Sequence, residues 1–539
     1  MGAGVSEADL IRGDLEWGTT PMLVRSAAQT YGDHPAIVDA DITLSYAELH
    51  QKVAEAARAF IGAGIEPGDR VAIWAPNIWE WPVAALGLHS AGAVLVPLNT
   101  RYKGTEAAYI LSASRARILL TVEGFLGNDY VSMLRAAEVD LAHLERIVVL
   151  RGDVSGEAMS FDEFVALGAD IAQDAAEERV AALRPDDLCD LLFTSGTTGA
   201  PKGVMCTHAQ TLRASCDWGS VGGLRSDDRY LVVNPFFHSF GYKAGIIASL
   251  CKGATIYPEP VFDVPRIMAA IERHRITTLP GPPTIYQTML NHPDFDPARL
   301  SSLRLIVTGA AAVPVQMIQA LRDQLGVETI LTAYGLTEVT GFASSCRPGD
   351  DPETISNFSG RAYPGVELET RRDDGTRCDP MEPGEIMVRG YNVTQGYFED
   401  PAKTAETIEP DGWLHTGDIG VMDERGYLRI TDRKKDMFIV GGFNVYPVEV
   451  EGLLLDHRDI AQAAVVGVPD DRMGEVGVAF VVPTVGTAPD PEGLRAWARE
   501  HMANFKAPVR FIVVDALPTN PSGKVLKYEL RDRAAAEMN

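Results

Sequence analysis

Four hydroxyl side chains, three glycines and one lysine are concentrated in the stretch LLFTSGTTGAPKG, which runs from Leu191 to Gly203. Glycines let the backbone turn sharply and approach a ligand closely. Hydroxyl groups and backbone N–H groups can hold phosphate oxygens, and the lysine adds positive charge. The stretch therefore predicts a loop that binds a polyphosphate, although a plain surface loop can have the same composition. The candidate phosphate-binding residues are Thr194, Ser195, Gly196, Thr197, Thr198, Gly199 and Lys202.

The spacing of this loop argues against two other phosphate-binding motifs. Lys202 is followed by Gly203, whereas the pattern G-x-x-x-x-G-K-[ST] requires serine or threonine there and wider spacing between the glycines. The loop does not fit G-x-G-x-x-G either. A nucleotide triphosphatase of the P-loop type and a dinucleotide-dependent dehydrogenase both lose support.

Composition limits the partners of the chain. The 539 residues carry a net charge of -26, which opposes a nucleic acid or an anionic membrane as the main partner. Hydrophobic content of 46% and charged content of 23% are typical of soluble globular proteins. The most apolar long run, residues 81–98, contains Pro82 and Pro97 and is expected to form a helix and a strand, not an integral membrane span.

The six cysteines are scattered and include no C-x-x-C pair, so neither a metal centre nor a disulfide framework is expected. Reduced thiols in a cytoplasmic protein are the expected state. The N-terminal sequence MGAGVSEADL lacks a basic region and an apolar core, so a secretory signal is not expected.

The elements that must position the loop follow from the hydrophobic periodicity. Ser45 and Glu48 have capping-box spacing, and apolar residues recur at helical period from Leu49 to Ile61. RVAIWAP and AVLVPL read as strands on either side of a helix, which makes a β-α-β unit. The alternation recurs through YLVVNPF, ATIYP, ITTLPG, LRLIVTGA and ETILTAYG, with helices expected after Gly241, at residues 265–274 and after Pro314.

The texture changes beyond about Glu367, where short strands and turns dominate. The last hundred or so residues read as a compact α+β segment, with strands at AAVVGVP and GVAFVVP and helices between. We therefore predict an α/β fold with a large N-terminal domain of parallel-type subdomains plus a β-rich subdomain, and a small C-terminal α+β domain. The predicted bounds are residues 1–432 for the N-terminal domain, 433–436 for a hinge and 437–539 for the C-terminal domain.

The segment TSGTTGAPKG matches the phosphate-loop signature of the acyl-adenylate-forming superfamily, which the chain therefore resembles. Five further motifs follow in that family's order: NPFFHSFGY, TAYGLTE, GWLHTGD, YLRITDRKKDMFIVGGFNVYPVEVE and NPSGKVLK. The match extends from about residue 20 to 530. The resemblance implies an acid–thiol ligase that uses ATP, Mg²⁺ and coenzyme A. In such a reaction a carboxylate attacks the α-phosphate, pyrophosphate leaves, and a thiol displaces AMP.

The resemblance also implies roles for individual residues. Residues 194–202 would hold the β- and γ-phosphates, Tyr334 would stack on adenine, Thr337 would contact the α-phosphate and Glu338 would help to hold Mg²⁺. Asp418 would accept from the ribose hydroxyls, with Arg433 as a second ribose contact. The remaining residues of the expected nucleotide site are Gly309, Ala310, Ala311, Thr332 and Gly335.

The C-terminal motifs resemble the part of this family that moves between two half-reactions. Lys524 would bridge the acyl carboxylate and the α-phosphate during adenylation, and Lys435 would be the hinge residue. Rotation of a mobile C-terminal domain would then withdraw Lys524 and present Gly441 and Gly442 to the pantetheine arm of coenzyme A.

The acyl site is expected around NPFFHSFGY, with His238 as a gate and not a general base. No aspartate there could hold an α-ammonium group, so an apolar carboxylic acid is expected rather than an amino acid. Several fragments are similar to actinobacterial ligases for the propionate side chain of partly degraded sterol rings, and Tyr242 or Lys243 could meet a ring ketone. The other expected pocket residues are Phe236, Phe240, Ala244, Pro283, Ala312 and Phe342.

Three hypotheses stay open from the sequence. The first is a coenzyme A ligase acting on a fatty or alicyclic acid. The second is a free-standing adenylation enzyme that loads a carrier protein. The third is a non-catalytic nucleotide-binding relative, which would be expected to have lost Lys524 or Glu338, and both are present. Luciferase activity fits the scaffold, but no residue points to a light-emitting substrate. A homodimer also remains open.

Overall fold

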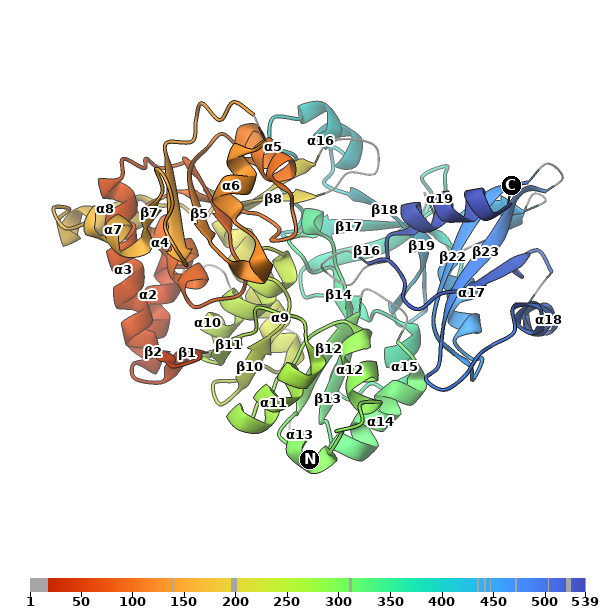
Figure 1. Ribbon diagram of the computed structural model, residues 1–539. Helices are drawn as coiled ribbons and strands as arrows, with labels where there is room; N and C mark the ends of the chain where they lie inside the picture. Colours follow the sequence, from red (N-terminus) through yellow and green to blue (C-terminus); the bar gives the residue numbers. More distant parts are fainter. Residues whose placement is uncertain are drawn as a thin grey trace.

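The computed structural model describes residues 18–539 except 138, 195–200, 310–312, 434–435, 441–442, 446, 471–472, 503, 520–524 and 539. At 432, 433, 439, 443 and 444 it describes the backbone alone. Figure 1 shows an α/β molecule in which strands and helices alternate over most of the chain, as the sequence predicts.

The first sheet carries the phosphate-loop segment at one edge. Its strands are parallel except the last, which runs antiparallel to its neighbour. In spatial order they are β7 (Met159–Ser160), β6 (Arg146–Arg151), β5 (Ala116–Val122), β3 (Arg70–Trp74), β4 (Val94–Pro97), β8 (Leu188–Thr194) and β9 (Lys202–Thr207). The helices that connect or flank them are α3 (Tyr46–Gly62), α4 (Glu80–Ser90), α5 (Gly104–Ser114), α6 (Tyr130–Arg135), α7 (Phe161–Ala166) and α8 (Gln173–Ala182), with η2 (Phe125–Gly127).

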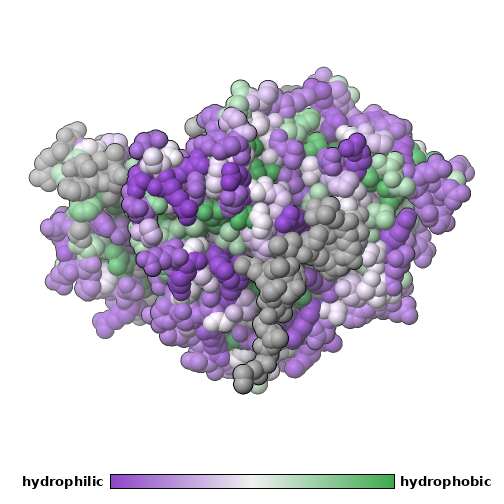
Figure 2. All heavy atoms as spheres, turned by 180° about the vertical axis from the view of Figure 1, so that it is seen from behind, coloured by the Kyte–Doolittle hydropathy of each residue, from purple (hydrophilic) through white to green (hydrophobic). Residues whose placement is uncertain are grey.

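The expected capping box at the start of α3 is present. Glu48 N donates to the Ser45 hydroxyl, and the Glu48 carboxylate accepts from Ser45 N at 2.8 Å. The apolar run at 81–98 forms α4 and β4, as predicted. Among the described residues no helix is both long enough and apolar enough to cross a membrane. Figure 2 shows the face opposite to that of Figure 1 as mostly hydrophilic, with apolar residues in small separate areas.

The second sheet is assembled from two halves. One half has the order β10 (Arg229–Val232), β11 (Thr255–Pro258), β1 (Pro35–Asp39), β2 (Ile42–Ser45), and the other β12 (Leu305–Gly309), β13 (Thr329–Tyr334), β14 (Ser344–Ser345), β15 (Arg361–Ala362). Thr278 joins the halves through single parallel bridges to Tyr230 and Leu305. ITTLPG also forms backbone hydrogen bonds to both halves, from Leu231 N to Thr278 O at 3.0 Å and from Gly281 N to Val307 O at 2.9 Å. It therefore has the extended pairing that the sequence predicts, with its bridges at Thr278 alone.

Helices surround the second sheet and connect its strands. The expected helix after Gly241 begins as a π-helix, η3 (Phe240–Ile247), and continues as α10 (Ala248–Lys252). The others are α2 (Thr20–Tyr31), α9 (His208–Gly222), α11 (Val264–His274), α12 (Pro283–Leu290), α13 (Pro297–Leu300), α14 (Val315–Leu325) and α15 (Pro352–Asn357), with η4 (Thr337–Val339).

The third sheet is the expected β-rich part. Its four strands are antiparallel neighbours: β16 (Val366–Arg371), β17 (Gly384–Gly390), β18 (Leu414–Met422) and β19 (Leu428–Arg433). Helix α16 (Pro401–Thr407) lies in the connection between β17 and β18. That connection also carries the residues that reach the phosphate loop.

The last sheet contains β21 (Phe443–Val445), β20 (Phe438–Val440), β23 (Gly474–Pro483), β22 (Ile460–Asp470) and β24 (Arg510–Val513). β22 and β23 pair directly, so no helix separates them; helices α17 (Pro447–Leu454), α18 (Pro491–His501) and α19 (Lys527–Met538) flank the sheet instead. The strand period sends Val465 and Val466 to opposite faces, where two separate cores form.

From Phe438 onward, the described core residues form two hydrophobic clusters. Both are distinct from the hydrophobic cluster that spans residues 23–428. Separate cores are what two folding units would have. The bounds of the two domains and of the hinge stay predictions.

Candidate active site

Two antiparallel strands flank the phosphate-loop segment. β8 and β9 pair in register, so that Thr194 lies opposite Lys202 and Phe193 opposite Gly203. Most of β8 is buried, which anchors the base of the hairpin in the first sheet. Residues 195–200, which hold the predicted Ser195, Gly196, Thr197, Thr198 and Gly199, lie outside the described residues.

Lys202 stands at the foot of this hairpin beside residues from a distant part of the chain. Its Nζ lies 3.4 Å from Asp400 Oδ2 and 5.8 Å from the centre of the Tyr397 ring. The Lys202 and Asp400 side chains are each about a third exposed. Such a partly exposed ion pair is weak, so Lys202 can leave Asp400 and bind another anion, such as a phosphate group.

The segment from Tyr391 to Asp400, which we call the clasp, joins three parts of the site. Against β9, Met205 N donates to Gly396 O at 3.0 Å and Phe398 N donates to Gly203 O at 2.8 Å. Against the TAYGLTE segment, Thr394 N donates to Glu338 O at 2.9 Å. Against α9, Gln210 Nε2 donates to Tyr391 O at 3.1 Å. The clasp therefore ties the phosphate hairpin to the segment with the predicted metal ligand.

The predicted metal ligand Glu338 receives a hydrogen bond from this clasp. Tyr397 Oη donates to Glu338 Oε1 at 3.0 Å, across 59 residues of sequence. Desolvation of the phenol and the nearby carboxylate raise the pKa of Tyr397, so the hydroxyl stays protonated and acts as the donor. Glu338 itself lies in η4 and is half-buried, as is Thr337 beside it.

The predicted adenine site lies where β12 and β13 end. These parallel strands pair Gly309 with Ala333, so their carboxyl ends meet at one edge of the sheet, where ligands of such sheets commonly bind. A Cβ on Gly335 would lie 1.9 Å from Gly341 O, so only glycine fits there. Ala310 and Ala311 lie outside the described residues.

The predicted adenine and ribose contacts meet each other. Tyr334 Oη donates to Asp418 Oδ2 at 2.6 Å, and both side chains are buried. Asp418 is in β18, where its backbone pairs with that of Arg433 in β19. The third sheet thus brings the GWLHTGD motif to the end of β13.

One predicted nucleotide contact has another use. The Thr332 hydroxyl lies 2.6 Å from Phe358 O and 2.9 Å from Ile355 O, and it is buried. The hydroxyl has a single proton, and a bond to either carbonyl holds the end of α15, whereas the role of Thr332 toward the nucleotide stays a prediction.

Four of the predicted residues lie outside the described part of the chain: Lys435, Gly441, Gly442 and Lys524. Their roles, and the side-chain role of Arg433, stay predictions.

An aromatic wall lies next to the TAYGLTE segment. The Trp218 ring centre is 6.1 Å from that of Phe240 and 6.2 Å from that of Phe342, and Phe342 lies 6.2 Å from Tyr363. A Cβ on Gly341, which has φ +98°, would lie 3.2 Å from the Ser239 side chain. The HSF segment and the segment after Glu338 are therefore in close contact, with Phe240 and Phe342 on the same wall.

His238 lies two residues before Phe240 of this wall. The residue is accessible to solvent, yet protein surrounds it closely enough that desolvation lowers its pKa to about 4. Phe240 N donates to His238 Nδ1 at 3.1 Å, which leaves the proton of the neutral ring on Nε2. A neutral imidazole whose Nδ1 already accepts a hydrogen bond is poorly suited to act as a general base.

Three of the other predicted acyl residues are buried: Phe236, Ala244 and Pro283. The Phe236 ring packs on Trp81, with ring centres 5.4 Å apart. Ala312 lies outside the described residues. The structure also gives Tyr242 and Lys243 other partners than a ring ketone. Lys243 Nζ lies 3.2 Å from Asp190 Oδ1 with both side chains fully buried, and Tyr242 Oη lies 3.6 Å from Cys189 Sγ.

The cysteine expectation is wrong for one pair. Cys216 in α9 and Cys251 in α10 form a disulfide, with Cα atoms 5.9 Å apart, whereas Cys189, Cys206, Cys346 and Cys378 are free and buried. The bonded cysteines are 35 residues apart, and only the packing of α9 beside α10 brings them together. Spacing rules for local cysteine motifs cannot detect such a pair.

Sequence reasoning missed the clasp, Trp218 and Tyr363. The one local signal for the clasp is GYFEDP, in which glycine and Asp-Pro mark a turn before α16. Trp218 offered no signal beyond its place in a helical pattern. Among the described residues no group of three or more potential ligands could hold a metal ion by itself.

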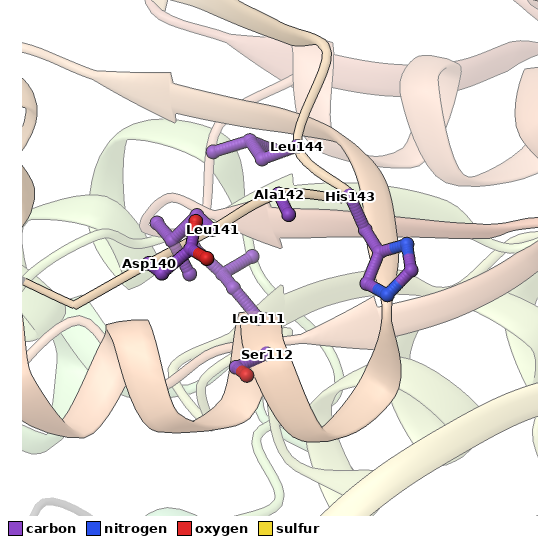
Figure 3. Close-up of a pocket in the computed structure, with 7 residues that line it drawn as sticks. All are labelled: Leu111, Ser112, Asp140, Leu141, Ala142, His143 and Leu144. Carbon is purple, nitrogen blue, oxygen red and sulfur yellow. The ribbon is translucent and has the colours of Figure 1, made fainter.

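A depression of about 200 Å³ beside α5 is separate from these residues. It is lined by Leu111, Ser112, Asp140, Leu141, Ala142, His143 and Leu144. Figure 3 shows Asp140 and His143 at opposite ends of the lining, so their polar groups do not converge on one point. We find no predicted site residue there.

Comparison with protein families identifies both parts of the chain. Residues 24–398 match the AMP-binding enzyme family, and residues 449–524 match the AMP-binding enzyme C-terminal domain. Two curated relatives are named methyl-dioxo-octahydro-indenyl propanoyl:CoA ligases. The one from Mycobacterium tuberculosis is 51% identical and the one from Rhodococcus jostii 48%, and each alignment covers 95% of this chain and 98% of the relative.

Solved structures share the fold at lower identity. An anthranilate CoA ligase in complex with anthranoyl-AMP is 28% identical, with a TM-score of 0.86 and coverage of 96% of this chain and 98% of that one. ATP-bound MatB from Rhodopseudomonas palustris is 29% identical, with a TM-score of 0.84 and coverage of 97% and 100%.

Proposed function

Because the chain belongs to the AMP-binding enzyme family, we propose that it is an ATP-dependent acyl-CoA ligase that works through an acyl-adenylate. The overall reaction joins a carboxylate to coenzyme A and converts ATP to AMP and diphosphate. We further propose that the acid is the propionate side chain of a sterol-derived alicyclic ring system. Two relatives that match nearly the full length are named as ligases for a propanoyl group on a bicyclic diketone.

The observation that carries the proposal is that a pair of charged residues and a pair of aromatic rings lie on adjoining segments. Glu338 and Lys202 stand on one side, joined through the clasp. Phe240 and Phe342 stand on the other, joined through the contact of Gly341 with Ser239. A charged triphosphate and an apolar acid could therefore be held side by side, which is the arrangement that adenylation needs.

The nucleotide roles follow from this placement. Thr194 to Lys202 would hold the β- and γ-phosphates, Thr337 the α-phosphate, and Gly309, Ala310, Ala311, Tyr334 and Gly335 the adenine. Binding of ATP would require Tyr334 and Asp418 to exchange their mutual hydrogen bond for contacts with adenine and ribose. Arg433 would add a ribose contact.

The residues present also fit Mg²⁺. This ion favours one or two carboxylates together with substrate phosphates rather than a cage of protein ligands. Glu338 supplies one carboxylate close to the phosphate hairpin, so the lack of a three-ligand group among the described residues is compatible with such a site. When bound, the ion would neutralise charge on the phosphates as pyrophosphate leaves.

The acyl side would provide shape and exclusion of water. Trp218, Phe240 and Phe342 offer ring faces to an alicyclic acid, and the neutral His238 could donate from Nε2 without taking a proton. Lys524 would bridge the acyl carboxylate and the α-phosphate, Lys435 would be the hinge, and Gly441 with Gly442 would admit the pantetheine arm of coenzyme A.

The test is pyrophosphate release with ATP and Mg²⁺ over a panel of acids, with and without coenzyme A. The panel contains short, medium and long fatty acids, an aryl acid, amino acids and a ring-ketone propionate. The ligase proposal expects turnover on an apolar acid that requires coenzyme A and yields AMP and a thioester. Pyrophosphate release that coenzyme A never accelerates would instead favour a carrier protein as the acceptor.

A variant separates the two half-reactions. Lys524→Ala should lose adenylation yet still form thioester from supplied acyl-AMP, because the lysine is needed only while charge builds on the α-phosphate. Equal loss of both steps would overturn that assignment.

A further inference from the structure

We propose that Tyr397 is a positioning residue for the metal–nucleotide complex, holding the Glu338 carboxylate toward the phosphates and apart from Lys202. This inference rests on the proposed function, because it assumes that Glu338 meets Mg²⁺ and Lys202 meets phosphate. Tyr397 was not among the residues that the family motifs single out.

The Tyr397 backbone is fixed on both sides. It forms an antiparallel bridge with Val204 in β9, only two residues beyond Lys202. Its N–H donates to Thr404 Oγ1 at 2.9 Å, in α16. The preceding Gly396 has φ +115°, and a Cβ there would lie 2.5 Å from the Thr404 side chain, so the turn tolerates only glycine. The ring is therefore presented from a rigid frame.

The two ends of the Tyr397 side chain meet opposite charges. Lys202 Nζ lies over the ring face, where the aromatic quadrupole attracts a cation, and Asp400 lies beside it. Glu338 Oε1 accepts from the hydroxyl. The described ion pair of Lys202 is with Asp400 and not with Glu338.

This separation has a consequence for ligand binding. Glu338 and Lys202 have opposite charges and stand near the same ring, so a direct pair between them would cancel both before the nucleotide arrives. The hydroxyl of Tyr397 fixes one carboxylate oxygen, and a carboxylate can coordinate a cation through its other oxygen. A hydrogen bond to a charged group is among the stronger ones, so its loss should be measurable.

The test is equilibrium binding to the full-length protein carrying Tyr397→Phe, measured by calorimetry with three probes. These are ATP with excess Mg²⁺, ATP with a chelator, and AMP. Phenylalanine keeps the ring, the bridge to Val204 and the cation–ring contact, and removes only the hydroxyl. We expect the Kd of Mg²⁺·ATP to rise by about 10- to 100-fold, while the other two Kd values change by less than about twofold.

Tyr427→Phe is the matched control. Tyr427 Oη also donates to a carboxylate, Asp350, at 2.9 Å, but it lies outside the clasp and the Glu338 segment. This variant should bind all three probes like the wild type. A double-mutant cycle with Glu338→Gln adds a second readout, because the effect of Tyr397→Phe should largely vanish once the carboxylate is gone.

Several results would overturn the proposal. These are a Tyr397→Phe variant that binds Mg²⁺·ATP like the wild type, one that weakens all three probes equally, or effects that simply add in the cycle. A wild type that binds ATP no more tightly with Mg²⁺ than without it would also overturn it. Failure of the proposed function is seen separately, as absence of thioester in the acid panel.

Discussion

The nucleotide side and the acyl side of the site are built on different physical principles. On the nucleotide side, single hydrogen bonds join polar groups far apart in sequence, such as Tyr334 with Asp418 and Tyr397 with Glu338. On the acyl side, Trp218 and Phe342 are buried rings in mutual contact. Tyr334 and Asp418 can exchange their mutual hydrogen bond for contacts with a ligand while Tyr397 keeps Glu338 in place, whereas the rings offer a fixed shape. The difference indicates that rearrangement on binding is concentrated on the nucleotide side.

The largest expected effect comes from breaking the nucleotide side at its carboxylate. Glu338→Gln keeps the size and an acceptor for Tyr397 but removes the charge. Pyrophosphate release should fall by about 10²- to 10³-fold, because stabilisation of developing phosphate charge is lost. The Kd of AMP and the free energy of unfolding should stay close to wild type. Steady-state rates at saturating Mg²⁺ and a denaturant titration check this. A loss of unfolding free energy as large as the increase in activation free energy would argue that Glu338 has a structural role.

The same contrast explains what the sequence could predict. The capping box at Ser45 and the β-α-β units depend on local demands of the backbone, and they were recognisable in the printed residues. The contacts of Trp218 with Phe342, the Cys216–Cys251 disulfide and the reach of Tyr397 to Glu338 depend on packing between distant segments. No local periodicity encodes them. Thr332 adds a structural contact that its motif does not reveal, since its hydroxyl meets Phe358 O.

A second prediction concerns the buried cluster below the phosphate hairpin. Thr20 Oγ1 lies 3.2 Å from His89 Nδ1 and 3.1 Å from His208 Nδ1, and His89 Nε2 lies 3.0 Å from Cys189 O in β8. Desolvation lowers the pKa of His208 to about 3 and that of His89 well below its usual value, which His208 lowers further. Two histidines that are buried in the neutral form therefore lie against β8, the strand that leads to the phosphate-loop segment.

The sign of the pH effect follows from that lowering. Each histidine binds a proton in the unfolded chain at a pKa near 6.5 but not in the folded one, so stability is full above about pH 6.5 and falls as the pH is lowered toward 3. Between pH 6.5 and 5 we expect His208 to contribute a loss of about 2 kcal/mol, with a further loss of the same sign from His89. Urea titrations of the wild type and of His208→Asn, which keeps an acceptor for Thr20, should differ by about this amount in their pH dependence. An identical dependence would show that His208 is not the group responsible.

The third prediction tests whether the acyl side is independent of the nucleotide. Phe342→Leu keeps an apolar side chain but removes the ring contacts with Trp218 and Tyr363. We expect a loss of about 1 kcal/mol in stability and about a tenfold fall in kcat/KM for the ring acid. The KM for ATP should not change, and this difference between the two substrates is what the comparison requires. A parallel rise in the KM for ATP would show that the two sides are coupled through the Gly341 contact with Ser239.

The smallest expected effect comes from the partner of Lys202. Asp400→Asn removes a negative charge beside the phosphate hairpin, while asparagine can still cap α16, where Asp400 Oδ1 accepts from Lys403 N at 2.9 Å. Lys202 would then no longer have to leave a carboxylate in order to meet a phosphate. Because the pair is about one-third exposed and therefore weak, the Kd of ATP should fall by only about two- to fivefold.

Salt separates this explanation from a change in shape. The gain in ATP affinity should shrink as the ionic strength rises, since a partly exposed charge is screened over about 10 Å at 0.1 M salt. Glu367→Gln is a suitable control, because Glu367 pairs with Arg389 in the third sheet and not with Lys202. If Asp400→Asn weakened ATP binding at every salt concentration, Asp400 would be acting to hold Lys202 in position for the phosphate, and the nucleotide side would be as fixed in geometry as the aromatic wall opposite.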